Sequence, residues 1–124
     1  MTSPDETSAG TAHGLTVRWS LVDAEPGTLA RLRDYVAGTS HATFGSLDGL
    51  RFKTWRAREG QWFEGTYVFA SPADRQRFQA DFAQRAATAP GSQLIGSAPV
   101  IEECEIIAVA EGPAGFLAAP RYDT

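Results

Sequence analysis

Cysteine and histidine are scarce in this chain of 124 residues, which has one Cys and two His. These side chains are the usual ligands of structural zinc and of iron–sulfur clusters, and a disulfide needs two cysteines. The shortage excludes a Cys-rich zinc site, an iron–sulfur cluster and an intramolecular disulfide. A Gly-rich phosphate loop, a nucleophile elbow and an HExxH helix are also missing, so we expect no bound nucleotide, hydrolase triad, metal or other cofactor.

Positive charge and long apolar runs are equally scarce. The chain has 11 Lys and Arg against 15 Asp and Glu, a net charge of −4, and such a balance argues against a nucleic-acid partner. No apolar run approaches the roughly 18 residues of a membrane-spanning helix, and the first residues do not resemble a signal peptide. With the lone Cys104, which fits a reducing compartment, these features predict a cytoplasmic protein without a membrane partner.

Composition divides the chain into three segments. Residues 1–13 are rich in Ser, Thr, Gly and Ala, have nothing to bury, and are predicted to form a disordered N-terminal arm. Residues 14–112 have the length of one domain. Residues 113–124 are rich in Gly, Pro and Ala, and we expect a tail that packs through Phe116 and Leu117.

Hydrophobic periodicity predicts the elements of the domain. Apolar residues alternate with polar ones from Leu15, recur at helical spacing after Thr28, and alternate again on both sides of Glu59-Gly60-Gln61, a hairpin signal. Ser71 and Pro72 start a second helix, since Ser caps and Pro occupies the first helical position. The predicted elements are strands over 14–22, 50–58, 62–70 and 99–111, helices over 28–38 and 72–89, and a loop over 38–49.

The order β-α-β-β-α-β is the ferredoxin-like arrangement, an α+β fold with a four-stranded antiparallel sheet and two helices on one face. Those helices leave the other face bare. The third and fourth strands nevertheless carry apolar residues on both sides, which predicts burial on both sides. We therefore expect a homodimer that covers the second face. The alternative is that the 38–49 loop and the C-terminal tail cover it.

The hairpin carries a more specific pattern, G-L-x-x-K-x-W…G-x-Y-x-F, which runs from Gly49 to Phe69 and leads directly into a helix. This pattern resembles the small dimeric α+β barrel proteins, and most of all their YdhR-type mono-oxygenase branch, over about residues 14–113. The resemblance implies a homodimer in which two sheets face each other as a barrel, with a small-molecule pocket between sheet and helices in each subunit. The longer 38–49 segment, the N-terminal arm and the C-terminal tail depart from the family pattern.

Two strand faces supply candidate binding residues. Lys53 and Trp55 share a face of their strand, as do Tyr67 and Phe69 on the neighbouring strand. If these faces coincide, a cation, an indole and a phenol converge, and they could stack a flat ligand and bind its carbonyl or phenolate oxygen. Alternatively, Trp55 and Tyr67 belong to the core and Lys53 extends to water.

Two further residues are candidates for a general base. His41 carries an imidazole, the side chain most often used as a general base, and lies in a Gly- and Ser-flanked segment, although it could equally be a solvent-facing loop residue. Glu64 interrupts an aromatic strand, where it is either a desolvated acid or base or a partner in a cross-strand ion pair. Glu102, Glu103 and Glu105 have no neighbouring His, so they do not predict a metal site, and Cys104 is expected to be buried.

Three functions fit these residues and the resemblance. The first is a cofactor-independent mono-oxygenase, or a related cyclase or isomerase, that acts on an aromatic or polyketide-like molecule. In that reading His41 or Glu64 is the base, Tyr67 and Lys53 hold the developing oxyanion, and Trp19, Trp55 and Phe78 form the walls. The second is a module that binds a small ligand without turnover. Haem binding ranks last, because His41 is the only axial ligand the domain offers.

Overall fold

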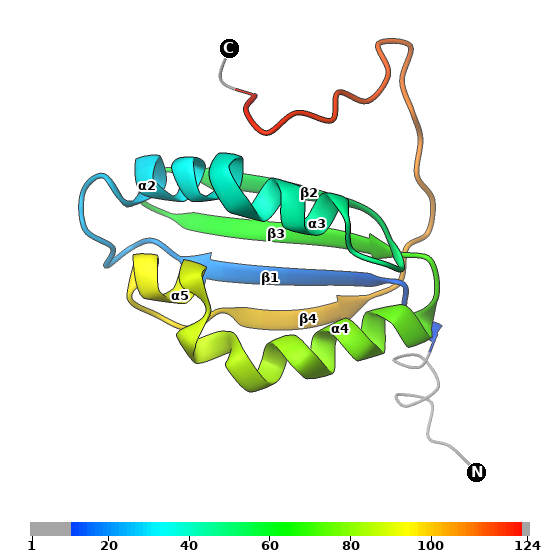
Figure 1. The fold of residues 1–124 in the computed structure, drawn as a ribbon, viewed down its shortest axis with the longest axis horizontal. Coiled ribbons are helices and arrows are strands. Elements are labelled where there is room, and N and C mark those ends of the chain that lie inside the picture. The colour runs from blue at the N-terminus through cyan, green and yellow to red at the C-terminus, as the bar shows by residue number, and fades with distance from the viewer. Residues whose placement is uncertain (1–10, 123–124) are drawn as a thin grey trace.

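The computed structural model describes residues 11–122, and it places all the helices on one face of a single four-stranded sheet (Figure 1). The strands are β1 (Gly14–Ser20), β2 (Leu50–Arg58), β3 (Trp62–Phe69) and β4 (Val100–Cys104). The helices are α2 (Thr28–Tyr35), α3 (His41–Gly45), α4 (Pro72–Arg85) and α5 (Pro90–Ile95), with a π-helical turn at Val36–Ser40 and a 3₁₀ turn at Ala86–Thr88.

The sheet is antiparallel throughout, with the order β2-β3-β1-β4. The predicted ferredoxin-like α+β fold is therefore confirmed. β1 is central, and its inward residues Leu15 and Val17 are fully buried. Trp19 continues this face, and its indole N–H donates to the Ser92 hydroxyl on α5 at 3.0 Å, which ties the second helical region to the sheet.

The segment 38–49, predicted as a loop, is mostly helical. The π-helical turn and α3 continue α2 without a break, so that His41 and Phe44 lie on a helix. The inward positions Leu32, Val36, Ser40 and Phe44 follow one another at intervals of four residues. In a regular α-helix such a row drifts by about 40° at each step. The wider π turn compensates for this drift and keeps the row facing the sheet.

The last strand is shorter than predicted. β4 ends at Cys104 instead of continuing to residue 111, because its partner β1 begins at Gly14, which is the residue paired with Cys104. Beyond that point the chain has no strand to pair with, and it leaves the sheet. Cys104 was expected to be buried, but it is exposed.

The helix over 72–89 also differs from the prediction in its second half. α4 is capped by Ser71, whose hydroxyl accepts from the Asp74 N–H at 3.1 Å, as the sequence predicts. It ends at Arg85, however, and Pro90 begins a new helix, α5. Proline is well suited to this first helical position, since its missing N–H has no helical partner there.

The predicted N-terminal arm is described only in part, because residues 1–10 lie outside the described residues. Ala12 is buried, and its carbonyl accepts from the Arg75 Nε at 2.9 Å. The carbonyl of His13 accepts from the Phe69 N–H at 2.9 Å. The end of the segment assigned to the arm is thus packed against β3 and α4.

The face of the sheet opposite the helices has a charged cluster at its centre. Glu64 on β3 accepts hydrogen bonds from Arg18 on β1 at 2.8 Å and from Arg56 on β2 at 2.7 Å. Both guanidinium groups also lie over the Trp62 ring. Burial alone would raise the pKa of Glu64, but the hydrogen bonds and charges of the two arginines outweigh it and hold the pKa below its ordinary value. Apolar residues flank the cluster: Phe52, Val68 and Val100.

The pKa shift of Glu64 leads to a prediction about stability. Because the pKa is lowered in the folded chain, the carboxylate stabilises the fold above its unfolded pKa of about 4.3, and this contribution is lost as the pH falls. We expect Glu64→Gln to lower the free energy of unfolding by about 1–3 kcal/mol at pH 7. The difference from the unsubstituted chain should shrink below about pH 4, as measured by urea unfolding at several pH values.

The matched control is Glu59→Gln in the hairpin turn, where the carboxylate is exposed and pairs with no described residue. This variant should change the free energy of unfolding little at any pH. If Glu64→Gln lowers the free energy of unfolding by the same amount down to pH 3, the stabilisation does not come from the ionised carboxylate.

Candidate functional site

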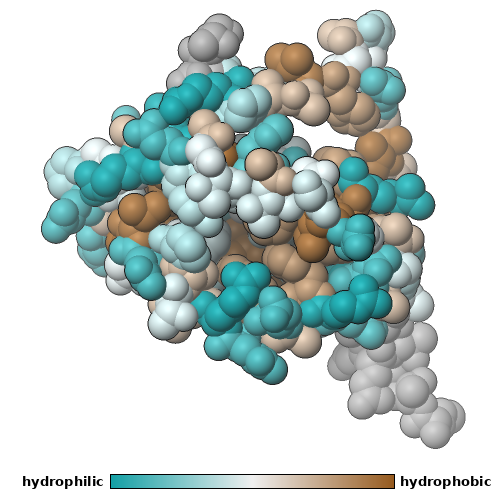
Figure 2. All heavy atoms as spheres, viewed as in Figure 1, coloured by the Kyte–Doolittle hydropathy of each residue, from teal (hydrophilic) through white to brown (hydrophobic). Residues whose placement is uncertain are grey.

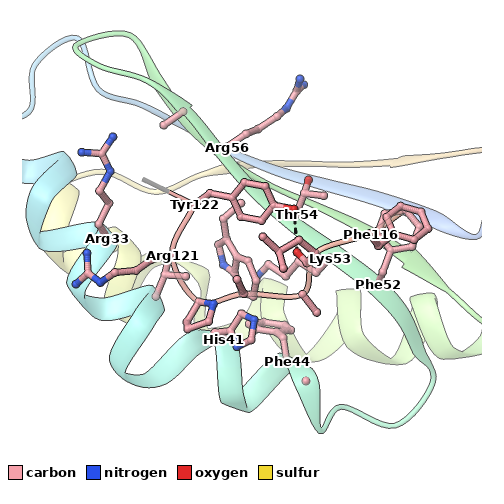
Figure 3. Close-up of a pocket in the computed structure, with 18 of the residues that line it drawn as sticks. Arg33, His41, Phe44, Phe52, Lys53, Thr54, Arg56, Phe116, Arg121 and Tyr122 are labelled. Carbon is pink, nitrogen blue, oxygen red and sulfur yellow. Dashed lines mark hydrogen bonds between the residues drawn. The ribbon is translucent and has the colours of Figure 1, made fainter. Parts of the chain in front are cut away.

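A hollow of about 940 Å³ lies between the helical segment from α2 to α3, the edge strand β2 and the C-terminal segment. Figure 2 shows the C-terminal segment standing apart from the body of the molecule, with an opening beneath it. Close up, Arg33 and Arg121 lie at one end of the hollow and Phe52 and Phe116 at the other (Figure 3). His41, Lys53 and Tyr122 lie between these ends.

Lys53, the only lysine of the chain, is the most unusual group in the hollow. Its Nζ lies 3.3 Å from the ring centroid of Phe44, 4.5 Å from that of Trp55 and 4.4 Å from that of Tyr67. It has no hydrogen bond and no ion pair with any described residue. Burial lowers the pKa of Lys53 well below its ordinary value, because the charged form has lost water. The attraction of the ammonium to the three ring faces offsets part of the free energy lost with its water.

Strand register explains how the lysine reaches this position. Lys53 pairs with Tyr67 and Trp55 pairs with Gly65 across β2 and β3, so all four face the helices. A Cβ atom at Gly65 would lie 3.1 Å from the Lys53 Cε and 3.2 Å from the Tyr67 hydroxyl. A larger residue would therefore push these side chains away. A glycine inside an aromatic strand is a sequence signal for such a close approach.

α3 supplies the opposite wall. The ring of His41 lines the hollow 5.9 Å from the ring of Trp55, measured between centroids. One helical turn later, Phe44 packs against Trp55, Tyr67 and Phe78 and closes the aromatic cage around Lys53. Phe44 is not among the site residues predicted from the sequence, because Gly38 and Gly45 make its segment resemble a loop. The three-residue spacing from His41 was the available signal.

The structure separates the predicted site residues into two groups. His41, Lys53 and Trp55 line the hollow together. The other four do not line it: Trp19, Glu64, Tyr67 and Phe78.

Glu64 faces the other side of the sheet and is engaged by two arginines, as in the ion-pair reading. Trp19, Tyr67 and Phe78 are buried in the core that supports the hollow. Burial raises the pKa of Tyr67, so its hydroxyl stays protonated at neutral pH.

The C-terminal segment closes the outer side of the hollow. Its Phe116 ring lies 6.0 Å from the ring of Phe52, and its Arg121 forms an ion pair of 2.7 Å with Asp34 on α2. The Tyr122 hydroxyl donates to the Leu117 carbonyl at 2.9 Å, which folds the segment back on itself. The packing expected of Phe116 and Leu117 is partial: both line the hollow, and they remain 66% and 64% exposed.

Two classes of site have no support in residues 11–122. No group of three or more His, Cys, Asp and Glu side chains is arranged to hold a metal ion. No helix in this range is both long and apolar enough to cross a membrane.

Solved structures with the same arrangement were found, although no protein-family model matches the chain and no curated protein is similar to it in sequence. One is the NE2512 protein of unknown function from Nitrosomonas europaea, with 28% identity, a TM-score of 0.57, and coverage of 86% of this chain and 99% of that one. Another is a monooxygenase from the gene ActVA-Orf6 of Streptomyces coelicolor in complex with Nanaomycin D, with 16% identity, a TM-score of 0.60, and coverage of 86% and 96%.

The environment of Lys53 can be tested by NMR on protein labelled with ¹³Cε-lysine, which gives a single signal because the chain has one lysine. We expect its titration midpoint to fall well below the ordinary value of about 10.4. Phe44→Ala opens the cage to water and should raise the midpoint toward that value. Trp62→Ala removes a ring from the opposite face of the sheet, outside the hollow, and should leave it unchanged. A midpoint near 10.4 in the unsubstituted chain would show that the amine is hydrated.

Proposed function

We propose that the chain is a small-molecule enzyme of the dimeric α+β barrel type, and more specifically a cofactor-independent mono-oxygenase of the YdhR-type branch. The observation that carries this proposal is the convergence of His41, Lys53 and Trp55 on one hollow. A volume of about 940 Å³ lies within the range of small-molecule binding pockets. The fold shared with a monooxygenase crystallised with Nanaomycin D supports the same class of activity.

The proposed reaction converts a phenol to a quinone. His41 takes the phenolic proton, and Lys53 stabilises the phenolate oxygen. The electron-rich ring then reacts with dioxygen: one oxygen atom becomes the new carbonyl oxygen, and the other leaves as water with two hydrogens of the substrate. The substrate supplies all the electrons, so the reaction needs no reductant. We assign the base to His41 and not to Glu64, because the Glu64 carboxylate faces away from the hollow.

A binding module without turnover is the second candidate. Catalytic bases are usually oriented by a further hydrogen-bonding group. His41 has no such partner among the described residues, and this favours binding alone. A cyclase or isomerase would use the same base without consuming dioxygen.

Oxygen consumption separates these functions. With 1,5-dihydroxynaphthalene as the probe, we expect enzyme-dependent uptake of one dioxygen per quinone formed, measured with an oxygen electrode and by absorbance. His41→Asn should lower the rate by about 100-fold or more, since it removes the base. The control is His13→Asn, which replaces the other histidine of the chain. Binding of naphthols without oxygen uptake would favour the module and contradict the oxygenase.

The proposal includes a homodimer, because no helix in the range 11–122 covers the second face of the sheet, which the C-terminal segment reaches at Phe52 on the edge strand (Figure 1). Phe52, Trp62 and Val68 on this face are half-buried, and Val100 is 61% exposed. Apolar side chains on an uncovered sheet face favour association with a second copy.

Light scattering tests the dimer. We expect a mass of twice that of one chain. Val68→Arg places a charge on the bare face and should give the single-chain mass, whereas Val22→Arg, in the exposed turn after β1, should not. A single-chain mass for the unsubstituted protein would contradict the proposed dimeric barrel.

A further inference from the structure

We propose that the hollow selects a flat aromatic molecule that carries a negative charge, as a carboxylate or an ionised phenol, and that Lys53 is the counterion of this charge. The proposal rests on the proposed function, since it names the substrate class for the same hollow. It is carried by the distribution of charge around the hollow and by the environment of the single lysine.

The lining of the hollow is charged in the opposite sense to the chain. The whole protein has an excess of acidic residues, yet no Asp or Glu lines the hollow. The basic residues that line it are Arg33, Arg51, Lys53, Arg56 and Arg121. Clustered charges of one sign around a concave site raise the local concentration of ligands of the other sign. The hollow is therefore suited to anions, although the protein as a whole repels them.

Two of these five cations are already paired with a carboxylate. Arg56 pairs with Glu64, and its guanidinium points away from the hollow in Figure 3. Arg121 pairs with Asp34. The side chains of the other three, Arg33, Arg51 and Lys53, form no ion pair and no hydrogen bond with the described residues. A net positive charge thus remains in the hollow, and Arg33 and Arg51 carry it at the exposed rim.

Lys53 is the half-buried part of this uncompensated charge. An ammonium in an apolar site is costly unless an anion or hydrogen-bond acceptors meet it. Its Nζ lies against three ring faces, which attract the cation but accept no strong hydrogen bond, and it has no hydrogen-bond acceptor among the described residues. A ligand oxyanion would supply the missing acceptor. Once the ligand has displaced the water around the amine, such a charged hydrogen bond is stronger than one on the open surface.

The rest of the lining explains why the anion should belong to an aromatic molecule. Trp55 and His41 present their rings to the hollow, and the C-terminal segment adds Tyr122 and Phe116 on the outer side. These surfaces bind planar apolar groups by stacking. A small inorganic anion would leave them unoccupied.

Two probes of the same shape test the charge. 2-Naphthoate and 2-naphthamide differ in the charge of one substituent, and their affinities are measured by isothermal titration calorimetry without any turnover. We expect naphthoate to bind roughly 10- to 100-fold more tightly, the range for a hydrogen bond between charged groups. Lys53→Met should abolish most of this preference. Arg58→Met, an exposed cation on the same strand outside the hollow, should preserve it.

A second measurement uses the unsubstituted chain, so that its result does not depend on whether Lys53→Met folds. The ¹³Cε signal of Lys53 should shift on addition of naphthoate, and its titration midpoint should rise, because a bound anion favours the ammonium.

The other outcomes overturn different claims. Equal affinity for the two probes overturns the charge selectivity but leaves the hollow as a binding site. A preference that Lys53→Met does not reduce overturns the role of Lys53. Failure of both probes to bind overturns the hollow itself, and with it the proposed function.

Discussion

One aromatic layer between the sheet and the helices determines where every other feature of this protein lies. Tyr67 is at its centre, with ring centroids 5.1 Å from Phe78 on α4 and 5.6 Å from Phe44 on α3. Aromatic rings in tilted and edge-to-face contact bury large areas and hold their neighbours in defined orientations. The layer joins both helical regions to the sheet. Lys53 ends against its outer margin, where the layer meets the hollow.

Each face of the sheet carries one charged side chain in apolar surroundings, and the two charges are stabilised in different ways. On the bare face Glu64 is neutralised by two arginines at hydrogen-bonding distance. On the helical face the Lys53 ammonium lies against three rings and pairs with no residue in the range 11–122. A fully paired group is a structural feature, because its hydrogen-bonding capacity is used. An ion without a partner is available to a ligand, and this difference places the candidate function on the helical face.

Much of the fold could be predicted because its signals are local. Strand alternation, the Gly60 hairpin and the Ser71 cap depend on residues close together in sequence, and each is present in the structure. The helix through 38–45 escaped prediction because its two glycines weaken the helical signal, while packing against the sheet supplies the stability. The end of β4 was not predicted, because it depends on where the partner strand β1 begins, and that pairing is not visible in the local sequence.

The sequence by itself determined which side chains share a face of the sheet, since alternation along a strand leaves no other choice. It placed Lys53 and Trp55 together in this way. Only the tertiary structure decided that Tyr67 lies beneath them in the core and that Phe44 closes the cage. It also brought Arg33 and Arg121 to the same hollow. These contacts join segments far apart in the chain, and no local pattern encodes such distances.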